Sequence, residues 1–123
     1  MQRLVIIAIG GVVGALARYA AVVLVGDEDP TRWPWDTLAV NLVGALLIGI
    51  IAASSLVTTG PHWVGPFVIT GFLGGFTTFS AFALETGTLH DAGQALMAAG
   101  YVLVTMVGGL LAVRVGVVIG EPR

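Results

Sequence analysis

The sequence lacks cysteine and contains very little charge. With no cysteine among its 123 residues, the chain can form neither a disulfide nor a thiolate metal site. Charged residues make up 10% of the chain, whereas a soluble globular domain has about 25%. Hydrophobic residues make up 57% and the mean hydropathy is +1.00, so we expect a single integral membrane domain in contact with membrane lipid. The net charge of −2 argues against nucleic acid or an anionic lipid surface as a partner.

The sequence also lacks the residue sets that enzymes use. His62 and His90 fall in predicted linkers on opposite sides of the membrane. The chain contains no Ser/His/Asp set, no glycine-rich phosphate loop and no metal-ligand spacing. We therefore expect no enzymatic activity.

Four apolar runs predict an all-α membrane protein with four transmembrane helices. The runs cover residues 4–25, 38–57, 64–84 and 95–119. Each reaches the roughly 20 residues that a helix needs to cross a hydrocarbon core. The polar linkers between them cover residues 27–36, 58–62 and 85–94. Tryptophan lies at the ends of spans, where interfacial tryptophan is common, at Trp33, Trp35 and Trp63.

The first run also resembles a secretory signal peptide. Arg3 precedes the apolar residues, and Ala15-Leu16-Ala17 resembles a small-residue cleavage site. However, apolar sequence continues to Val25, and cleavage would leave Arg18 at the start of a fragment too short to span. We therefore expect this run to be retained as the first transmembrane helix.

The arginine bias between the two predicted sides of the membrane is small, a difference of one or two residues. Four spans put both termini on one side with Arg3, Arg114 and Arg123, while Arg32 lies on the other side. This difference mildly favours cytoplasmic termini. Such a small bias permits insertion in both orientations.

Glycines recur along several spans at near-helical spacing. They are Gly10, Gly11, Gly14, Gly44, Gly49, Gly100, Gly108 and Gly109. Small residues let helices approach closely, either within one chain or between subunits. Because four helices can hardly enclose a pathway alone, we predict that part of this surface binds a second subunit.

Residues 71–82, read as GFLGGFTTFSAF, predict a break in the third helix. Glycine lets the backbone depart from helical geometry, and the segment has Gly71, Gly74 and Gly75. Hydroxyls can bond backbone groups that such a break would free, and they are present at Thr77, Thr78 and Ser80. On a helix, one aromatic stripe would comprise Phe72, Phe76, Phe79 and Phe82. The alternative is that the glycines serve close helix packing and the phenylalanines contact lipid.

Polar side chains also lie inside the first two spans. Arg18 lies about 10 Å from the end of the first span, where a charge costs on the order of 2.5–3.5 kcal/mol. It either snorkels to the interface or supplies a fixed positive charge that attracts anions into a vestibule. Asn41 can donate two hydrogen bonds to an anion, or it can bond a neighbouring helix. Thr37 lies one turn earlier on the same face and can line an entrance.

The fourth span contains a further polar face. Tyr101 and Thr105 are four residues apart and share this face, which Gly109 continues. Glu85 follows the phenylalanine stripe and is the expected carboxylate at the end of the third helix.

These motifs resemble those of the Fluc family of fluoride channels, and the similarity covers the whole chain. Residues 71–82 are similar to the third-helix signature of that family. Arg18 stands in the same Gly-Gly-x-x-Gly-Ala-x-x-Arg setting, and the second span shares Trp-Pro-Trp and Asn-Leu-Val-Gly with the family. The resemblance implies an antiparallel, dual-topology homodimer with two pores in the plasma or inner membrane.

The resemblance also implies roles for pore residues. Phe79 and Phe82 from both subunits would present ring edges, which carry the positive side of the ring quadrupole, to fluoride. Such weak solvation lets an ion leave as readily as it enters. Asn41 and Ser80 would donate hydrogen bonds directly to the ion.

The remaining implied roles concern a cation and a polar track. A buried sodium ion at the centre of the dimer would bind the backbone carbonyls of Gly74 and Thr77 from each chain. The track would include Thr37, Tyr101 and Thr105, with Glu85 at the pore exit and Arg18 at the vestibule. Gly109 departs from the pattern, because a hydroxyl residue is expected there.

We therefore predict a fluoride-selective channel that passively exports cytoplasmic fluoride and protects against its toxicity. HF enters as a neutral molecule and ionises inside, and a membrane potential drives F⁻ outward by about 2.3 kcal/mol per 100 mV. The alternative is a small proton-coupled multidrug exporter with four spans, which needs a membrane-embedded carboxylate. Glu85 is the only candidate for that carboxylate. A non-transporting assembly subunit would not explain Arg18, Asn41 and a broken third span together.

Overall fold

The computed structural model describes residues 1–25 and 29–122, and these are helical apart from short connections. In chain order the elements are α1 (Gln2–Val25), α2 (Trp35–Ala53), α3 (Ser55–Thr58), η1 (Gly65–Leu73), α4 (Gly74–Phe76), α5 (Phe79–Asp91) and α6 (Ala95–Gly120). Four segments are long and apolar enough to cross a membrane: Gln2–Val25, Trp35–Ala53, Gly65–Asp91 and Ala95–Gly120. The prediction of an all-α protein with four transmembrane helices is confirmed. Arg123 and part of the predicted linker 27–36 lie outside the described residues.

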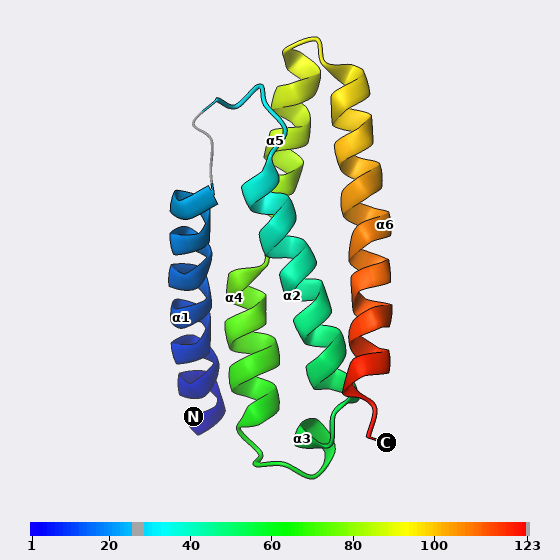
Figure 1. The fold of residues 1–123 in the computed structure, drawn as a ribbon. Coiled ribbons are helices and arrows are strands. Elements are labelled where there is room, and N and C mark those ends of the chain that lie inside the picture. The colour runs from blue at the N-terminus through cyan, green and yellow to red at the C-terminus, as the bar shows by residue number, and fades with distance from the viewer. Residues whose placement is uncertain (26–28, 123) are drawn as a thin grey trace.

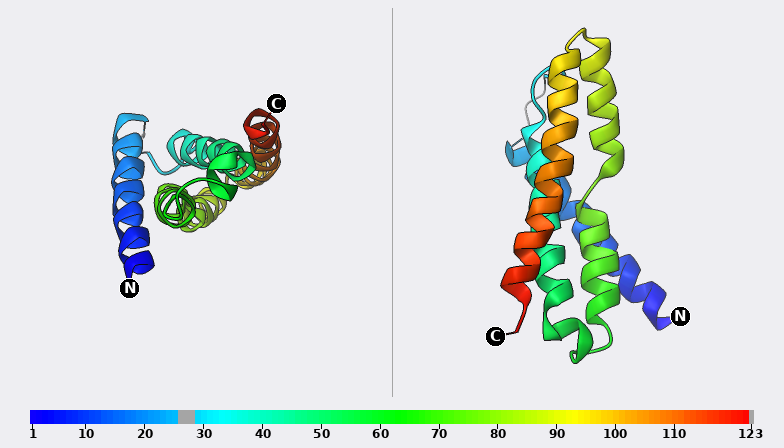
Figure 2. Two further views of the ribbon diagram at one scale, coloured as in Figure 1. Left: turned by 90° about the horizontal axis from the view of Figure 1, so that it is seen from below. Right: turned by 90° about the vertical axis from the view of Figure 1, so that its right-hand side faces the viewer.

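The helices run lengthwise beside one another (Figure 1). α2 packs along α6, while η1 and α4 pack against α1. α5 continues the column of η1 and α4 after a break and packs against α6. α1 crosses the other helices at an angle and lies at the edge of the bundle (Figure 2). The described chain ends lie at the same end of the molecule, as four spans require.

Close packing between α1 and the third span depends on glycine. A Cβ atom added at Gly71 would lie 2.7 Å from the carbonyl oxygen of Ile7, and one added at Gly10 would lie 2.5 Å from that of Phe67. Real Cβ atoms do not approach so closely, so these positions tolerate only glycine without movement of the backbone. This contact lies within one chain, whereas the space around Gly109 is open.

The predicted break of the third span within residues 71–82 is confirmed, and it lies at Thr77 and Thr78, beyond the three glycines of that segment. Gly74 is helical, with φ −63° and ψ −35°, so the expectation that the glycines themselves depart from helical geometry is wrong at this residue. Thr77 and Thr78 are extended, with ψ values of 155° and 115°. Thr78 then caps α5, because its hydroxyl accepts a hydrogen bond of 3.2 Å from the N–H of Ala81.

The third span is also longer than its apolar residues predict. The polar residues from 85 onward were expected to form a linker, but α5 continues to Asp91. Two hydroxyls in this stretch bond the carbonyl four residues earlier, Thr86 to Phe82 and Thr88 to Leu84. The helix can therefore carry these polar side chains without leaving their hydroxyls unsatisfied.

The second span is shorter at its end than predicted. α2 begins at Trp35 and ends at Ala53, because Ser54 adopts an extended conformation with ψ 154°. The Ser54 hydroxyl donates to the carbonyl oxygen of Ile51 at 2.7 Å and so bonds one of the last carbonyls of the helix. The residues that were expected to complete the span form the separate short helix α3.

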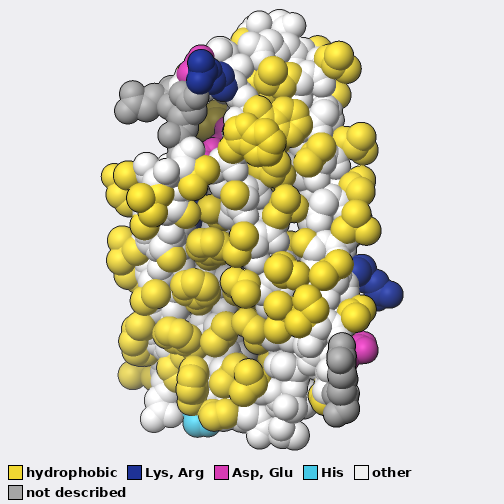
Figure 3. Space-filling model, in the orientation of Figure 1, with side chains coloured by type: hydrophobic (Ala, Val, Ile, Leu, Met, Phe, Trp, Pro, Cys, Tyr) yellow, Lys and Arg dark blue, Asp and Glu magenta, His cyan; other side chains and the backbone are white. Residues whose placement is uncertain are grey.

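The buried core is small and most of the surface is apolar. Leu89 and Tyr101 are completely buried, and together with Leu38, Phe82 and Ala98 they form one cluster between α2, α5 and α6. Hydrophobic side chains cover most of the face that Figure 3 shows, with few charges among them. Such a surface suits contact with lipid rather than with water.

Candidate functional site

Asn41 on α2 binds the backbone at the break of the third span. Its Nδ2 donates to the carbonyl oxygen of Thr78 at 3.0 Å, and its Oδ1 accepts from the N–H of the same residue at 2.8 Å. The interhelical hydrogen bond considered as an alternative for Asn41 is therefore present. Because an amide nitrogen carries two hydrogens, one N–H remains available for another acceptor.

A groove of about 220 Å³ opens beside this contact. Its lining residues are Asn41, Thr77, Thr78, Phe79, Phe82, Thr105 and Met106. The Oγ1 atom of Thr105 is buried and has no hydrogen-bond partner within residues 1–25 and 29–122. The groove therefore combines an amide, a free hydroxyl and aromatic rings, which is a set of groups that can solvate a small anion.

The two phenylalanines of the groove differ in their environment. Phe82 is 6% exposed and belongs to the core, whereas Phe79 is 72% exposed. Their ring centroids lie 5.6 Å apart, with planes inclined by 51°. The exposed ring of Phe79 therefore lies at the surface of the chain beside the groove.

Ser80 does not line this groove. It is exposed, and its hydroxyl lies 3.3 Å from that of Thr78. Ser80 therefore sits beside the cap of α5, and the structure does not bring it together with Asn41 and Thr105 in one cavity.

Glu85 joins three helices through two short hydrogen bonds. Thr37 on α2 donates to Oε1 at 2.6 Å, and the Tyr101 hydroxyl on α6 donates to Oε2 at 2.7 Å. Tyr101 in turn packs its ring against Phe82 at a centroid distance of 5.3 Å. Glu85 was expected at the end of a helix, but it lies within α5 and connects the phenylalanines to the polar faces of α2 and α6.

Arg18 lines a second hollow, between α1 and the start of α5. The hollow measures about 290 Å³ and is lined by Ala15, Arg18, Tyr19, Val22, Thr37, Thr78 and Ala81. Arg18 is partly buried here rather than fully exposed. Thr37 lines this hollow together with Arg18 and also donates to Glu85. The hollow therefore brings a positive charge near the hydrogen bonds of Glu85.

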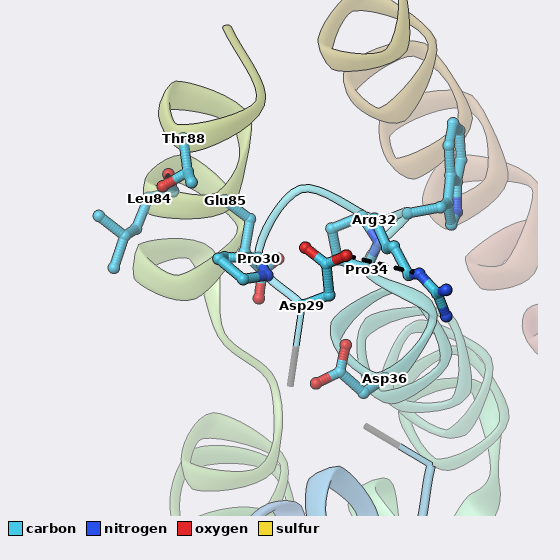
Figure 4. A pocket seen from close by; sticks show the side chains of 9 residues that line it. Asp29, Pro30, Arg32, Pro34, Asp36, Leu84, Glu85 and Thr88 are labelled. Atoms are coloured by element: carbon cyan, nitrogen blue, oxygen red, sulfur yellow. Dashed lines mark hydrogen bonds and ion pairs between the residues drawn. The ribbon is translucent and has the colours of Figure 1, made fainter. Parts of the chain in front are cut away.

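A third pocket, of about 230 Å³, was missed by sequence reasoning. It is lined by residues of the connection between α1 and α2, of the first turn of α2 and of α5 (Figure 4), and Asp29, Asp36 and Glu85 contribute carboxylates to it. Arg32 lies 3.6 Å from Asp29. The hydroxyl and the N–H of Thr31 donate to Asp29 and hold the pKa of this exposed carboxyl below its usual value. The acidic residues that precede the second span, which include Asp29 and Asp36, were the feature of the sequence that could have indicated this pocket.

The break frees two backbone carbonyls that could hold a cation. In an unbroken helix, the N–H of Thr78 would bond the carbonyl of Gly74, and the N–H of Ala81 would bond that of Thr77. Instead these two groups donate to Asn41 Oδ1 and to Thr78 Oγ1. Oxygen ligands suit Na⁺, so the residues present fit the implied ion. Within the described ranges there is no cluster of His, Cys, Asp or Glu that could hold a metal ion.

Residues 5–117 match the protein family described as CrcB-like protein, Camphor Resistance (CrcB). The chain is 46% identical over 115 residues to the fluoride-specific ion channel FluC of Paracoccus denitrificans (strain Pd 1222), which covers 94% of this chain and 91% of that protein. It is 39% identical over 124 residues to the fluoride-specific ion channel FluC of Chloroflexus aurantiacus (strain ATCC 29366 / DSM 635 / J-10-fl), with 98% and 97% covered. The protein of the same name from Mesorhizobium japonicum is 39% identical over 120 residues, which cover 94% of each chain.

Proposed function

The chain belongs to the CrcB family, and we propose that it is a fluoride-specific channel through which cytoplasmic fluoride leaves the cell passively. It is a multi-pass membrane protein, and since the family is one of ion channels it is not an enzyme. The relatives do not favour the alternative of a multidrug exporter. Glu85 is the only candidate for the carboxylate that such an exporter needs, and in the structure both of its oxygens accept hydrogen bonds, from Thr37 and Tyr101.

The groove beside the break carries this proposal. Fluoride is small and holds its water strongly, so a dry pathway must replace that water with hydrogen-bond donors. The remaining N–H of Asn41 and the buried hydroxyl of Thr105 are such donors in the lining of the groove. The rings of Phe79 and Phe82 in the same lining offer weaker contacts, which allow the ion to move on.

A second copy of the chain would complete the groove. Phe79 is 72% exposed although it lines the groove, so it is free to meet another subunit. The small arginine bias between the two sides permits both orientations in the membrane. We propose an antiparallel homodimer whose two-fold axis lies in the membrane plane near the break, so that each pathway contains residues of both subunits.

The same axis would supply a site for a structural sodium ion. The carbonyls of Gly74 and Thr77 lose their helical donors to Asn41 and Thr78, which leaves oxygen atoms available at the break. Two such carbonyls from each subunit would give four oxygen ligands. When bound, the ion would supply a positive charge that holds the breaks of the two subunits together. Fluoride would be solvated by the residues of the groove and not at this site.

Arg18 and the polar network would act on either side of the groove. Arg18 in its hollow would raise the local concentration of anions, because a partly buried charge is screened less than an exposed one. Thr37 and Tyr101 would hold Glu85 in place, and Thr105 would continue this polar face toward Gly109. Ser80, which is exposed in one chain, would reach the ion only from the interface between subunits.

The test is fluoride efflux from liposomes that contain the purified protein. We expect efflux of fluoride far above that from empty liposomes, and no comparable flux of chloride or of a lipophilic cation. Fluoride efflux equal to that of empty liposomes, combined with proton-dependent transport of the cation, would support the exporter instead.

A further inference from the structure

The contact between Asn41 and Thr78 closes a ring of two hydrogen bonds between a side chain and a backbone. The carboxamide accepts from the Thr78 N–H at 2.8 Å and donates to the Thr78 carbonyl at 3.0 Å. Thr78 is 8% exposed, so both of its backbone groups would be costly to leave without partners inside a membrane. The side chain of Asn41 therefore replaces the partners that a helix would give this peptide unit.

The neighbouring turn of α2 holds the other residue of the break. Gly44 lies three positions after Asn41, and a Cβ atom added there would overlap the Cγ2 methyl of Thr77. The Thr77 hydroxyl donates to the carbonyl oxygen of Leu73 at 2.9 Å, which fixes the orientation of that side chain. One face of α2 thus contacts both extended residues, Thr78 through Asn41 and Thr77 through Gly44.

Without this contact, a different hydrogen bond could close the break in the third span. The N–H of Thr78 is the helical donor for the carbonyl of Gly74, and in an apolar medium an unsatisfied N–H seeks the nearest acceptor. Bonding to Gly74 would add a helical turn and would occupy one of the two carbonyls that the break exposes. The amide of Asn41 competes with Gly74 for this single N–H.

We propose that Asn41 is a positioning residue that keeps the third span open and so keeps the Gly74 carbonyl available to a cation. The inference rests on the proposed sodium site. It assigns different roles to different atoms of the Asn41 carboxamide. The Oδ1 atom and one N–H hold the break, while the second N–H faces the groove. A side chain that lines the fluoride pathway is thereby coupled to the cation site.

Two measurements on purified protein, made without fluoride, test this role. The first is hydrogen exchange of the Thr78 amide by NMR. The second is the sodium concentration that gives half of the maximal thermal stabilisation. We expect slow exchange in the wild type. In Asn41→Leu, whose side chain has the same branching but forms no hydrogen bonds, at least about tenfold more sodium should be needed, because the Gly74 carbonyl is taken by Thr78.

Two further variants separate positioning from general damage. Asn41→Asp retains an acceptor for the Thr78 N–H, so its sodium requirement should stay within about threefold of the wild type. Thr105→Val removes a hydroxyl of the same groove that bonds nothing in the described chain, and it should leave both measurements unchanged. If Asn41→Leu cannot be purified, the exchange of the Thr78 amide in the wild type still tests the positioning role, because fast exchange would overturn it.

The outcomes distinguish this inference from the sodium proposal. Fast exchange of the Thr78 amide in the wild type, or the same sodium requirement in Asn41→Leu as in the wild type, would overturn the positioning role. A wild-type protein that sodium does not stabilise at all would overturn the sodium site, and with it the cation part of the inference.

Discussion

The hydroxyl of Tyr101 donates to the Oε2 atom of Glu85 at 2.7 Å, which joins α6 to α5 inside the third and fourth spans. Tyr101 is completely buried, so its hydroxyl could not find water as a substitute. The same ring contacts Phe82. Tyr101 thus links Phe82 of the groove to a carboxylate one turn further along α5.

Removal of this hydroxyl should weaken the fold without disturbing the ring. In Tyr101→Phe the ring still fills its place, but one Glu85 oxygen loses its donor. We expect a loss of stability of about 1–3 kcal/mol and slower fluoride efflux. Thermal unfolding in detergent measures the first effect. Tyr19→Phe is the matched control, since Tyr19 is 69% exposed, and it should unfold as the wild type does. Equal stability of the two variants would show that the bond to Glu85 contributes nothing.

The phenylalanines of the groove should differ in their effect on stability but not on transport. Phe82→Ile changes a buried shape and should cost about 1–3 kcal/mol, whereas Phe79→Ile should cost little because that ring is 72% exposed. Both should abolish or strongly reduce fluoride efflux from liposomes if ring edges solvate the ion.

Phe67→Ile serves as the control for these variants. Phe67 contacts Trp63 and lies outside the groove lining, so its replacement should leave efflux unchanged. Full-rate efflux through Phe82→Ile would show that this ring is only packing.

Arg18 should act through its charge. In Arg18→Gln we expect fluoride efflux to fall about tenfold at low ionic strength, and Arg18→Lys should retain most of it. The difference should shrink as salt is added, because salt screens the attraction of anions to the hollow. Arg114→Gln is the control, since Arg114 is exposed on α6 and lies outside this hollow. An effect of Arg18→Gln that does not change with salt would indicate a packing role.

Prolonged removal of sodium should inactivate the protein reversibly. Only backbone carbonyls are proposed as ligands, so their fixed spacing should make Li⁺ and K⁺ poor substitutes. The measurement is fluoride efflux after long exchange into sodium-free buffer, followed by return to sodium. The exchange into sodium-free buffer must last long enough to release a trapped ion. Undiminished efflux after complete exchange would exclude a functional sodium ion at Gly74 and Thr77.

Periodicity was sufficient to predict the polar faces of the helices. Thr37 and Asn41, four positions apart, share one face of α2, and the structure brings the first to Glu85 and the second to the break. Tyr101 and Thr105 are both buried on one face of α6. Helical spacing depends on local geometry alone, which is why these relationships could be predicted from the sequence.

The break was predicted within residues 71–82, but its exact residues could not be predicted in the same way. Glycine is permissive in any conformation, and here Gly71 serves the contact with α1. At the break, Thr78 donates a hydrogen bond to Asn41, which is 37 positions away in the sequence. Likewise, Glu85 was expected at a helix end because of its polarity, but it lies within α5 and accepts hydrogen bonds from Thr37 and Tyr101. Long-range hydrogen bonds override local signals at both places.

The central claim is that two chains in opposite orientations build each fluoride pathway, and forced orientation tests it most directly. One variant carries Asp91→Lys and Ala92→Lys at one end of the molecule, and the other carries Thr59→Lys and His62→Lys at the opposite end, all at exposed positions. These charges should fix the two variants in opposite orientations, because positive loops remain in the cytoplasm. The measurement is fluoride efflux from cells that produce one variant or both. The account predicts no efflux with either variant alone and restored efflux when both are produced together. Wild-type efflux from one fixed-orientation variant by itself would contradict the antiparallel dimer.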